Sequence, residues 1–273
     1  MQSTRPLVKS FTIVTINILV DLSHWKARRN LLVEGLSALE PDFIALQEVS
    51  IPENPANWLA HELGLDHYYL SPKTGFEASR EGIAILSRYP ITGQATLDLE
   101  GQQRVAQYVH LDMGGQPLVI ANTHLYWQPG NSAVRLKQVG LIIRWMQDLP
   151  QEMPVIICGD FNGTPETTAL AVMRQHYRSA HTIIHNREPD FTCPTPLPRS
   201  TWSTLRTFLG FFFLLRPQHI RLDWRGTLDY IFVNNNVLVN DCRVVLNQPS
   251  PLNPRIYPSD HYGIFANLSF GDK

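Results

Sequence analysis

The chain has 273 residues, of which 44% are hydrophobic and 17% are charged, and its formal net charge is −1. This length and apolar content allow a large buried core, and no composition shift or Gly/Ser-rich linker divides the chain, so we expect one domain over residues 1–273. The near-neutral charge excludes the strongly basic footprint of tight non-specific nucleic-acid binding, although an enzyme acting on nucleic acid needs only a local patch.

Cysteine usage and the amino-terminal sequence favour a location inside the cell. The three cysteines have neither metal-like nor disulfide-framework spacing, which fits a reducing compartment. No long apolar run follows the first basic residues, so no signal peptide is expected, and no apolar stretch is long enough to span a bilayer. We therefore predict a cytoplasmic protein, with peripheral membrane attachment as an open alternative.

Short β-type runs alternate with helical stretches along the chain. Alternating or β-branched apolar runs predict strands, and apolar residues recurring every three or four positions predict helices. The first half contains predicted strands at Phe11–Val20, Phe43–Val49, Gly82–Ile91, Val105–Met113 and Leu118–Leu125, and predicted helices at Trp25–Leu39, Asn57–Leu63 and Ser132–Leu149. The second half contains strands at Pro154–Phe161, Leu228–Asn234, Val237–Leu246 and His261–Phe270, and a helix at Thr167–Gln175. This mixture predicts an α/β sandwich with helices outside two sheets.

Polar side chains recur where the predicted strands begin or end. Burying such a group without a partner costs about 1–3 kcal/mol, and more when the group is charged. A chain that repeats this arrangement is expected to converge the side chains on one site, with the strands as rigid supports. Asn122 has an equally good alternative, a hydrogen bond to the backbone. The residues concerned are Asn17, Glu48, Asn122, His124, Asp160, Asn162, Asp229, Asp260 and His261.

Oxygen-rich side chains of this kind indicate a site for a hard divalent cation. Carboxylate and amide oxygens suit Mg²⁺, with Mn²⁺ as the alternative, whereas the cysteines do not accompany histidines as a zinc site requires. Imidazoles beside such a cation fit the attack of water on a phosphate ester without a covalent intermediate. The chain has neither a G-x-S-x-G elbow nor a GxxxxGK[ST] loop, which disfavours serine hydrolases and P-loop enzymes.

Seven segments resemble, in order and in approximate spacing, the endonuclease/exonuclease/phosphatase superfamily. They are TINILV, ALQEV, GIAILSRYPI, ANTHLYW, ICGDFNGTP, LDYIFV and PSDH, and the resemblance extends from Phe11 to Phe270. It implies a deoxyribonuclease I-like, four-layered α/β sandwich, in which two packed, mainly antiparallel sheets are flanked by helices and the metal site lies between the sheets at one edge. THLYWQPG and PVIICGDFNGTP resemble the deadenylase–nocturnin branch in particular, whereas GIAILSRYPI is closer to bacterial and sphingomyelinase-like members.

For the metal, the resemblance implies that Glu48 is the principal ligand and that Asn17 lies in or near the same shell. Asp260 would add a second metal contact or a supporting hydrogen bond. The alternative for Asn17 is a strand-end cap, and the alternative for Glu48 is a surface salt bridge. Arg80 and Glu81 precede a predicted strand, where they are either substrate-contacting groups or a solvated surface pair.

For catalysis, the resemblance implies that His124 hydrogen-bonds the scissile phosphate and that Asp160 orients or deprotonates the attacking water. Asn162 would hold that water or a phosphate oxygen. His261 would contact the phosphate and share protons, and Asp229 would orient its imidazole, as a carboxylate partner does. The alternatives are ordinary structural histidines and an Asx-turn at Asp160 and Asn162.

These expectations define an Mg-dependent phosphoric ester hydrolase, of which a nuclease or phosphodiesterase acting on nucleic acid or nucleotides is the favoured form. A phospholipid or sphingomyelin phosphodiesterase working at a membrane surface is the alternative. A catalytically inactive binding relative is a third hypothesis, which the presence of every motif residue disfavours. No obligate protein partner is inferred.

A hydrophobic insertion at about 203–220 bears on the choice between these substrates. Its apolar run, Phe208–Leu215, is flanked by Arg206 and Arg216. One interpretation is peripheral membrane contact, with the arginines at the level of the lipid headgroups. The other two are an element that covers the core and a contact with a protein partner.

Overall fold

The structure is a computed structural model that describes residues 10–194 and 225–271. The described residues form two six-stranded sheets packed face to face. The first sheet contains, in spatial order, β11 (Val237–Val245), β12 (Gly263–Phe270), β1 (Phe11–Asn17), β2 (Phe43–Ser50), β4 (Glu81–Ser87) and β3 (His67–Pro72). The second contains β5 (Ile91–Asp98), β6 (Val105–Asp112), β7 (Pro117–His124), β8 (Val155–Asp160), β10 (Asp229–Val233) and β9 (Arg178–Ser179).

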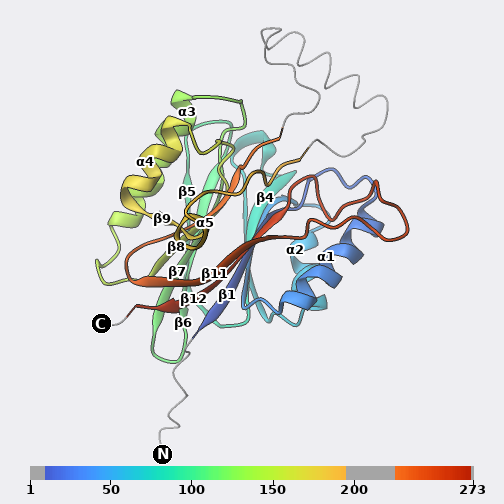
Figure 1. Ribbon diagram of the computed structural model, residues 1–273, viewed down its shortest axis with the longest axis horizontal. Coiled ribbons are helices and arrows are strands. Elements are labelled where there is room, and N and C mark those ends of the chain that lie inside the picture. Colours follow the sequence, from blue (N-terminus) through green and yellow to red (C-terminus); the bar gives the residue numbers. More distant parts are fainter. Residues whose placement is uncertain (1–9, 195–224, 272–273) are drawn as a thin grey trace, which may run out of the picture.

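Helices cover the outer faces of both sheets, so the molecule has four layers (Figure 1). On one side lie α1 (Trp25–Leu39) and α2 (Pro55–Glu62), and on the other lie α3 (Ala133–Gln147) and α4 (Thr168–His176). The short helix α5 (Ala180–His185) contacts β10 and β11, and η1 (Gly75–Glu77) is a 3₁₀ turn. The predicted four-layered sandwich is therefore confirmed.

Three separate apolar layers hold these elements together, because each sheet buries both of its faces. Between the sheets, Ile13, Ala45 and Ile85 of the first sheet share a core with Val109 and Ile120 of the second. A second core joins the outer face of the first sheet to α1 and α2, and a third joins the outer face of the second sheet to α3 and α4.

Two parallel strand pairs determine where the polar strand ends meet. Strands β1 and β2 are parallel across α1, and β7 and β8 are parallel across α3, whereas the other described pairs are antiparallel. The carboxyl ends of parallel strands lie at one edge of their sheet. Because β4, β6, β10 and β12 run the opposite way, their amino ends reach the same edge. The carboxyl ends of β1, β2, β7 and β8 therefore meet the amino ends of β4, β6, β10 and β12 at one end of the sandwich.

Several predicted boundaries were wrong, each for a local reason. The strand predicted over Gly82–Ile91 ends at Ser87, because the chain leaves β4 there and crosses to the other sheet, where β5 begins at Ile91. Pro90 lies in this crossing, where no ladder N–H is required. The strand predicted over Phe11–Val20 ends at Asn17, since Leu19 has a φ of 59°. The prediction also omitted β3, β5, β9 and α5.

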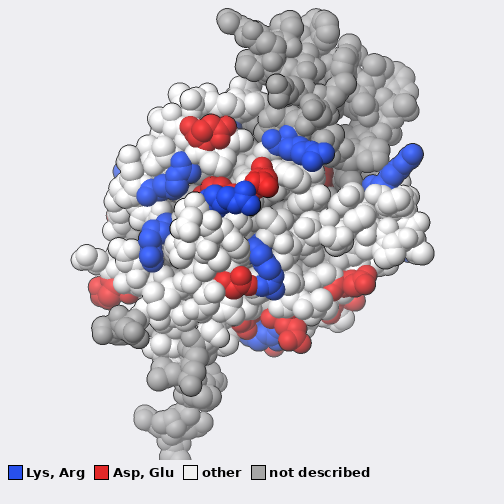
Figure 2. Space-filling view, viewed as in Figure 1, with Lys and Arg blue, Asp and Glu red and all other residues white. Residues whose placement is uncertain are grey.

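The insertion at about 203–220, with the apolar run Phe208–Leu215, lies outside the described residues, so its role stays a prediction. Among the described residues, no helix combines the length and the apolar character needed to cross a bilayer. On the face drawn in Figure 2, Lys and Arg side chains are interspersed with Asp and Glu. This mixed surface agrees with the net charge of −1.

Candidate active site

Three of the candidate catalytic residues are register neighbours in the second sheet. Asp160 ends β8, where it pairs with His124 at the end of β7 and with Asp229 at the start of β10. Side chains on adjacent strands at one register position lie close together. The close pairing of β7 and β8 depends on Gly159, whose φ is 133° and where a Cβ would lie 2.1 Å from the carbonyl oxygen of Thr123. This glycine therefore allows the two strands to approach closely.

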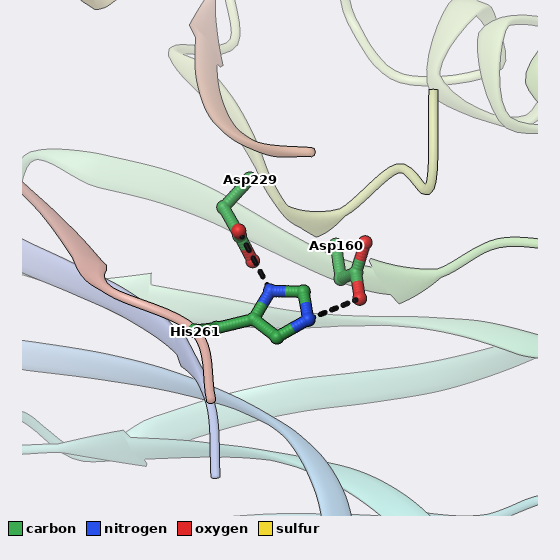
Figure 3. Close-up of side chains that lie close together, drawn as sticks. All are labelled: Asp160, Asp229 and His261. Carbon is green, nitrogen blue, oxygen red and sulfur yellow. Dashed lines mark hydrogen bonds and ion pairs between the residues drawn. The ribbon is translucent and has the colours of Figure 1, made fainter. Parts of the chain in front are cut away.

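His261 lies between the carboxylates of Asp229 and Asp160 (Figure 3). Its Nδ1 donates a hydrogen bond of 2.9 Å to Oδ2 of Asp229, and its Nε2 lies 3.9 Å from Oδ2 of Asp160. The same Asp229 oxygen accepts a 2.6 Å hydrogen bond from the hydroxyl of Thr192. Ligand atoms of Asp160, Asp229 and His261 all lie within 4.8 Å of one another.

The surroundings of His261 favour its protonated form. Burial alone would lower the pKa of this imidazole, but the negative charges of Asp229 and Asp160 outweigh burial and hold the pKa well above its usual value. Burial raises the pKa of Asp160, although the two neighbouring imidazoles partly oppose the shift. A carboxylate of raised pKa accepts a proton more readily, and an imidazole of raised pKa holds one to donate.

Asn17 and Glu48 reach the same place from the first sheet. The side-chain amide of Asn17 donates to Oε1 of Glu48 over 3.1 Å and to Oδ2 of Asp160 over 3.0 Å, which links the two sheets. The backbone N–H groups of Leu19 and Val20 donate to Oδ1 of Asn17 and Oε2 of Glu48. Burial and Glu81 would raise the pKa of Glu48, but His124 and these hydrogen bonds lower it below its usual value.

Glu48 was predicted to end its strand, but it lies in a bulge inside β2. The pairing of β2 with β4 is interrupted between Leu46 and Val49, and Glu48 has a φ of 55°. A left-handed conformation is uncommon for a glutamate and is found where the surroundings require it, often at functional sites. The bulge turns the Glu48 carboxylate toward Asn17, whose amide also donates to Asp160.

Two buried arginines support the loops that carry these groups. Arg28 of α1 donates to the carbonyl oxygens of Ile18, Leu19, Asp21 and Ser23, in the loop whose amides hold Asn17 and Glu48. Arg135 of α3 donates in the same way to the carbonyl oxygens of Tyr126, Gln128 and Gly130, in the loop after His124. Each crossover helix thus anchors the loop that follows a candidate site residue.

His124 connects the carboxylate of Asp160 to a buried network of charged side chains. Its Nε2 lies 3.4 Å from Oδ2 of Asp160, and its Nδ1 lies 2.7 Å from Nη1 of Arg104. Arg104 also pairs with Glu81, which in turn pairs with Lys73. Burial, and secondly the charge of Arg104, lower the pKa of His124 to about 3, so this imidazole is neutral near pH 7.

The other predicted site residues have different environments. Asn162 has a φ of 50°, and its backbone N–H donates to Oδ1 of Asp160 while its side-chain amide donates to the carbonyl oxygen of Leu125. Asp260 is half-buried beside His261 in the chain, and its Oδ1 accepts a hydrogen bond from Ser259.

Asn122, which the sequence left undecided, fastens the two sheets together. Its side-chain amide donates to the carbonyl oxygens of Leu46 and Ala84 and accepts a hydrogen bond from Gln47.

Sequence reasoning missed Lys73, Arg104 and Thr192. Arg104 immediately precedes a predicted strand, and the same polar-beside-apolar signal that singled out Asp229 also applies there. Of the pair left open, Glu81 is buried in the network with Arg104, whereas Arg80 is exposed and pairs with Glu77.

The donor set suits a hard divalent cation. The carboxylate oxygens of Glu48 and Asp160 converge on the side-chain NH₂ group of Asn17, and carboxylate oxygens are ligands that Mg²⁺ and Mn²⁺ prefer. Oδ1 of Asp229 is buried without a hydrogen-bond partner, so this carboxylate has acceptor capacity that the protein itself does not use. Among the described residues, the one cluster of three Asp, Glu, His or Cys with ligand atoms close together is Asp160, Asp229 and His261.

Two packed sheets with helices outside, and an acidic and imidazole-rich site at one end of the sandwich, define a deoxyribonuclease I-like fold. The profile described as the Endonuclease/Exonuclease/phosphatase family matches residues 14–261. The chain therefore belongs to the endonuclease/exonuclease/phosphatase family.

Individual relatives come from the nocturnin-like branch. Human nocturnin is 26% identical over 282 residues, covering 93% of this chain and 60% of that protein. The 2′,5′-phosphodiesterase 12 of Bos taurus is 26% identical over 292 residues, covering 89% of this chain and 46% of that protein. The chain thus spans about half to three-fifths of the length of these relatives.

Two solved structures show the same fold. The human nocturnin catalytic domain with a bound sulfate anion aligns with a TM-score of 0.74 at 23% identity, covering 98% of this chain and all of that one. Zebrafish (D. rerio) TDP2 complexed with a single-strand DNA product aligns with a TM-score of 0.75 at 18% identity, covering 95% of this chain and 99% of that one.

Proposed function

We propose that this protein is a divalent-metal-dependent phosphodiesterase or nuclease that hydrolyses nucleic acid or nucleotides by attack of water. The observation that supports the proposal most strongly is the convergence of three side chains from two sheets. Asn17 ends β1, Asp160 ends β8 and His261 lies just before β12, and Asp160 is within hydrogen-bond or ion-pair distance of the other two. The family and the names of the relatives support the substrate class, since they include a nocturnin and a 2′,5′-phosphodiesterase, and a TDP2 structure contains single-strand DNA.

The proposal assigns a task to each group. Asp160 accepts the proton of the attacking water, and Asn162 holds that water or a phosphate oxygen. His261, oriented by Asp229, donates a proton to the leaving oxygen. His124 hydrogen-bonds the scissile phosphate.

The cation would be held by Asn17 and Glu48, with Asp260 as a further contact, and Mg²⁺ is proposed, with Mn²⁺ as the alternative. When bound, it supplies positive charge that offsets the charge developing on the phosphoryl oxygens. The cytoplasmic location stays a prediction.

A substrate panel tests this proposal directly. The protein would be incubated with Mg²⁺ and single-stranded RNA, single-stranded DNA, sphingomyelin or inositol phosphates, in parallel with the Asp160→Asn variant as a control for contaminating nucleases. We expect cleavage of RNA, DNA or both, its loss in EDTA, and recovery when Mg²⁺ or Mn²⁺ is restored. Hydrolysis of sphingomyelin alone would support the lipid alternative, and activity that persists in EDTA would contradict metal dependence.

A further inference from the structure

Four buried polar side chains form a continuous network along one side of the candidate site. Lys73, Glu81 and Arg104 are each less than a tenth exposed, and His124 is 3% exposed. Nζ of Lys73 lies 2.6 Å from Oε2 of Glu81, and Nη1 of Arg104 lies 3.3 Å from Oε1 of the same carboxylate. Nη1 of Arg104 also lies 2.7 Å from Nδ1 of His124. The network thus ends at an imidazole that faces Asp160.

The geometry of this last contact determines where His124 carries its proton. A guanidinium has N–H donors and no acceptor, so an imidazole nitrogen 2.7 Å from Nη1 must accept. Nδ1 therefore carries no proton. The other group near Nδ1, Oε1 of Glu81, lies 3.6 Å away, which is too far for a hydrogen bond from Nδ1. A neutral imidazole protonated on Nε2 is the form that satisfies these contacts.

We infer that Arg104 is a positioning residue that holds His124 as a neutral imidazole with its proton on Nε2. His124 then donates a hydrogen bond to the substrate phosphate and does not carry protons during the reaction. The tautomer of His124 follows from the contact with Arg104 alone. Only the identification of the hydrogen-bond acceptor as a substrate phosphate rests on the proposed function. Glu81 and Lys73 support Arg104, because the carboxylate pairs with both cations.

The two histidines consequently have different tasks. Nδ1 of His261 donates to Asp229, so Nε2 of His261 is free to gain and lose a proton. Nδ1 of His124 instead accepts from a permanent cation. If His124 were protonated on both nitrogens, the N–H at Nδ1 would face the N–H donor of Arg104. The imidazolium would also add a third positive charge beside Arg104 and Lys73. One imidazole therefore transfers protons, and the other stabilises charge on the phosphate.

Nuclear magnetic resonance tests the tautomer without any catalytic assay. Long-range ¹H–¹⁵N correlation spectra of protein labelled with ¹⁵N-histidine report the protonation of each ring nitrogen, and the His124→Gln variant assigns the signals. Between pH 6 and 8 we expect an unprotonated Nδ1 and a protonated Nε2 for His124. Arg104→Met should change this pattern, whereas Lys73→Met, which removes a charge from the same network without touching Nδ1, should preserve it. A protonated Nδ1 in the wild type, or an unchanged pattern in folded Arg104→Met, would overturn the inference.

Measurements of kcat provide a second, independent test of the role of His124. The side-chain amide of glutamine places an N–H donor near the position of Nε2 but cannot carry a proton. His124→Ala should lose about 100-fold in kcat, as removal of a phosphate-side donor does, and His124→Gln should recover at least about tenfold of that loss. The His261→Gln and His261→Ala variants should be equally inactive. Equal loss in both His124 variants would overturn the assigned role. An inactive wild type with the expected spectrum would reject the proposed function while supporting the tautomer.

Discussion

Replacing Asp160 with asparagine should lower turnover by about 10³-fold while the fold is retained. Oδ2 of Asp160 accepts from Asn17 and faces both His124 and His261, and Oδ1 accepts from the backbone N–H of Asn162. An asparagine cannot take the proton of the attacking water. If its oxygen keeps the bond to Asn162, its amide group meets the donor of Asn17.

The matched control for this variant is Asp112→Asn. Asp112 also ends a strand of the second sheet, but it is exposed, at the opposite end from the site. Its Oδ1 accepts from the N–H of Gly115, which an asparagine can maintain. Turnover and melting temperature should both stay at the wild-type level. Turnover of Asp160→Asn within tenfold of wild type would refute the assigned role of Asp160.

Replacing His261 with alanine should also lower turnover by about 10³-fold, within the range observed for loss of a general acid. The imidazole lies 2.9 Å from Asp229 and 3.9 Å from Asp160, and the two carboxylates favour its protonated form. Its removal leaves the leaving oxygen without a proton donor. Steady-state kinetics on the substrate identified by the panel would measure the loss, and a circular dichroism melt would verify the fold.

His110→Ala is the corresponding control, because His110 lies on β6 outside the site and contacts the ring of Tyr108. We expect a small change in melting temperature and wild-type turnover. A His261→Ala enzyme that retained substantial kcat would show that the proton is supplied by another group.

The sequence predicted the central strands well because their signals are local. The run ending in Asp160 is apolar and β-branched, and both parallel pairs enclose a helix with a clear apolar period. The strands that were missed lie at sheet edges. β3 and β9 are edge strands, and β5 is an edge strand whose residues alternate between half-buried and exposed. Their formation depends on pairing with a distant partner, which no local pattern reveals.

The site residues likewise divide into those with a local sequence signal and those that depend on contacts between distant segments. The rule that polar residues beside buried strands converge led to Asn17, Asp160 and His261, which the structure brings together. The left-handed bulge at Glu48 was not predictable, because it arises from the register of β2 against β4. Arg104 and Lys73 were missed for a similar reason. They meet through Glu81 of β4, and Lys73, which follows β3, and Arg104, which precedes β6, become neighbours only after both sheets have formed.

Soaking Mn²⁺ into crystals of the protein and locating it by anomalous scattering tests the central claim most directly. We expect one strong peak at the sandwich end, about 2.0–2.4 Å from a carboxylate oxygen of Glu48, and its disappearance in Glu48→Gln crystals soaked in the same way. A peak at a different place on the molecule, or one that persists unchanged without the Glu48 carboxylate, would contradict the account.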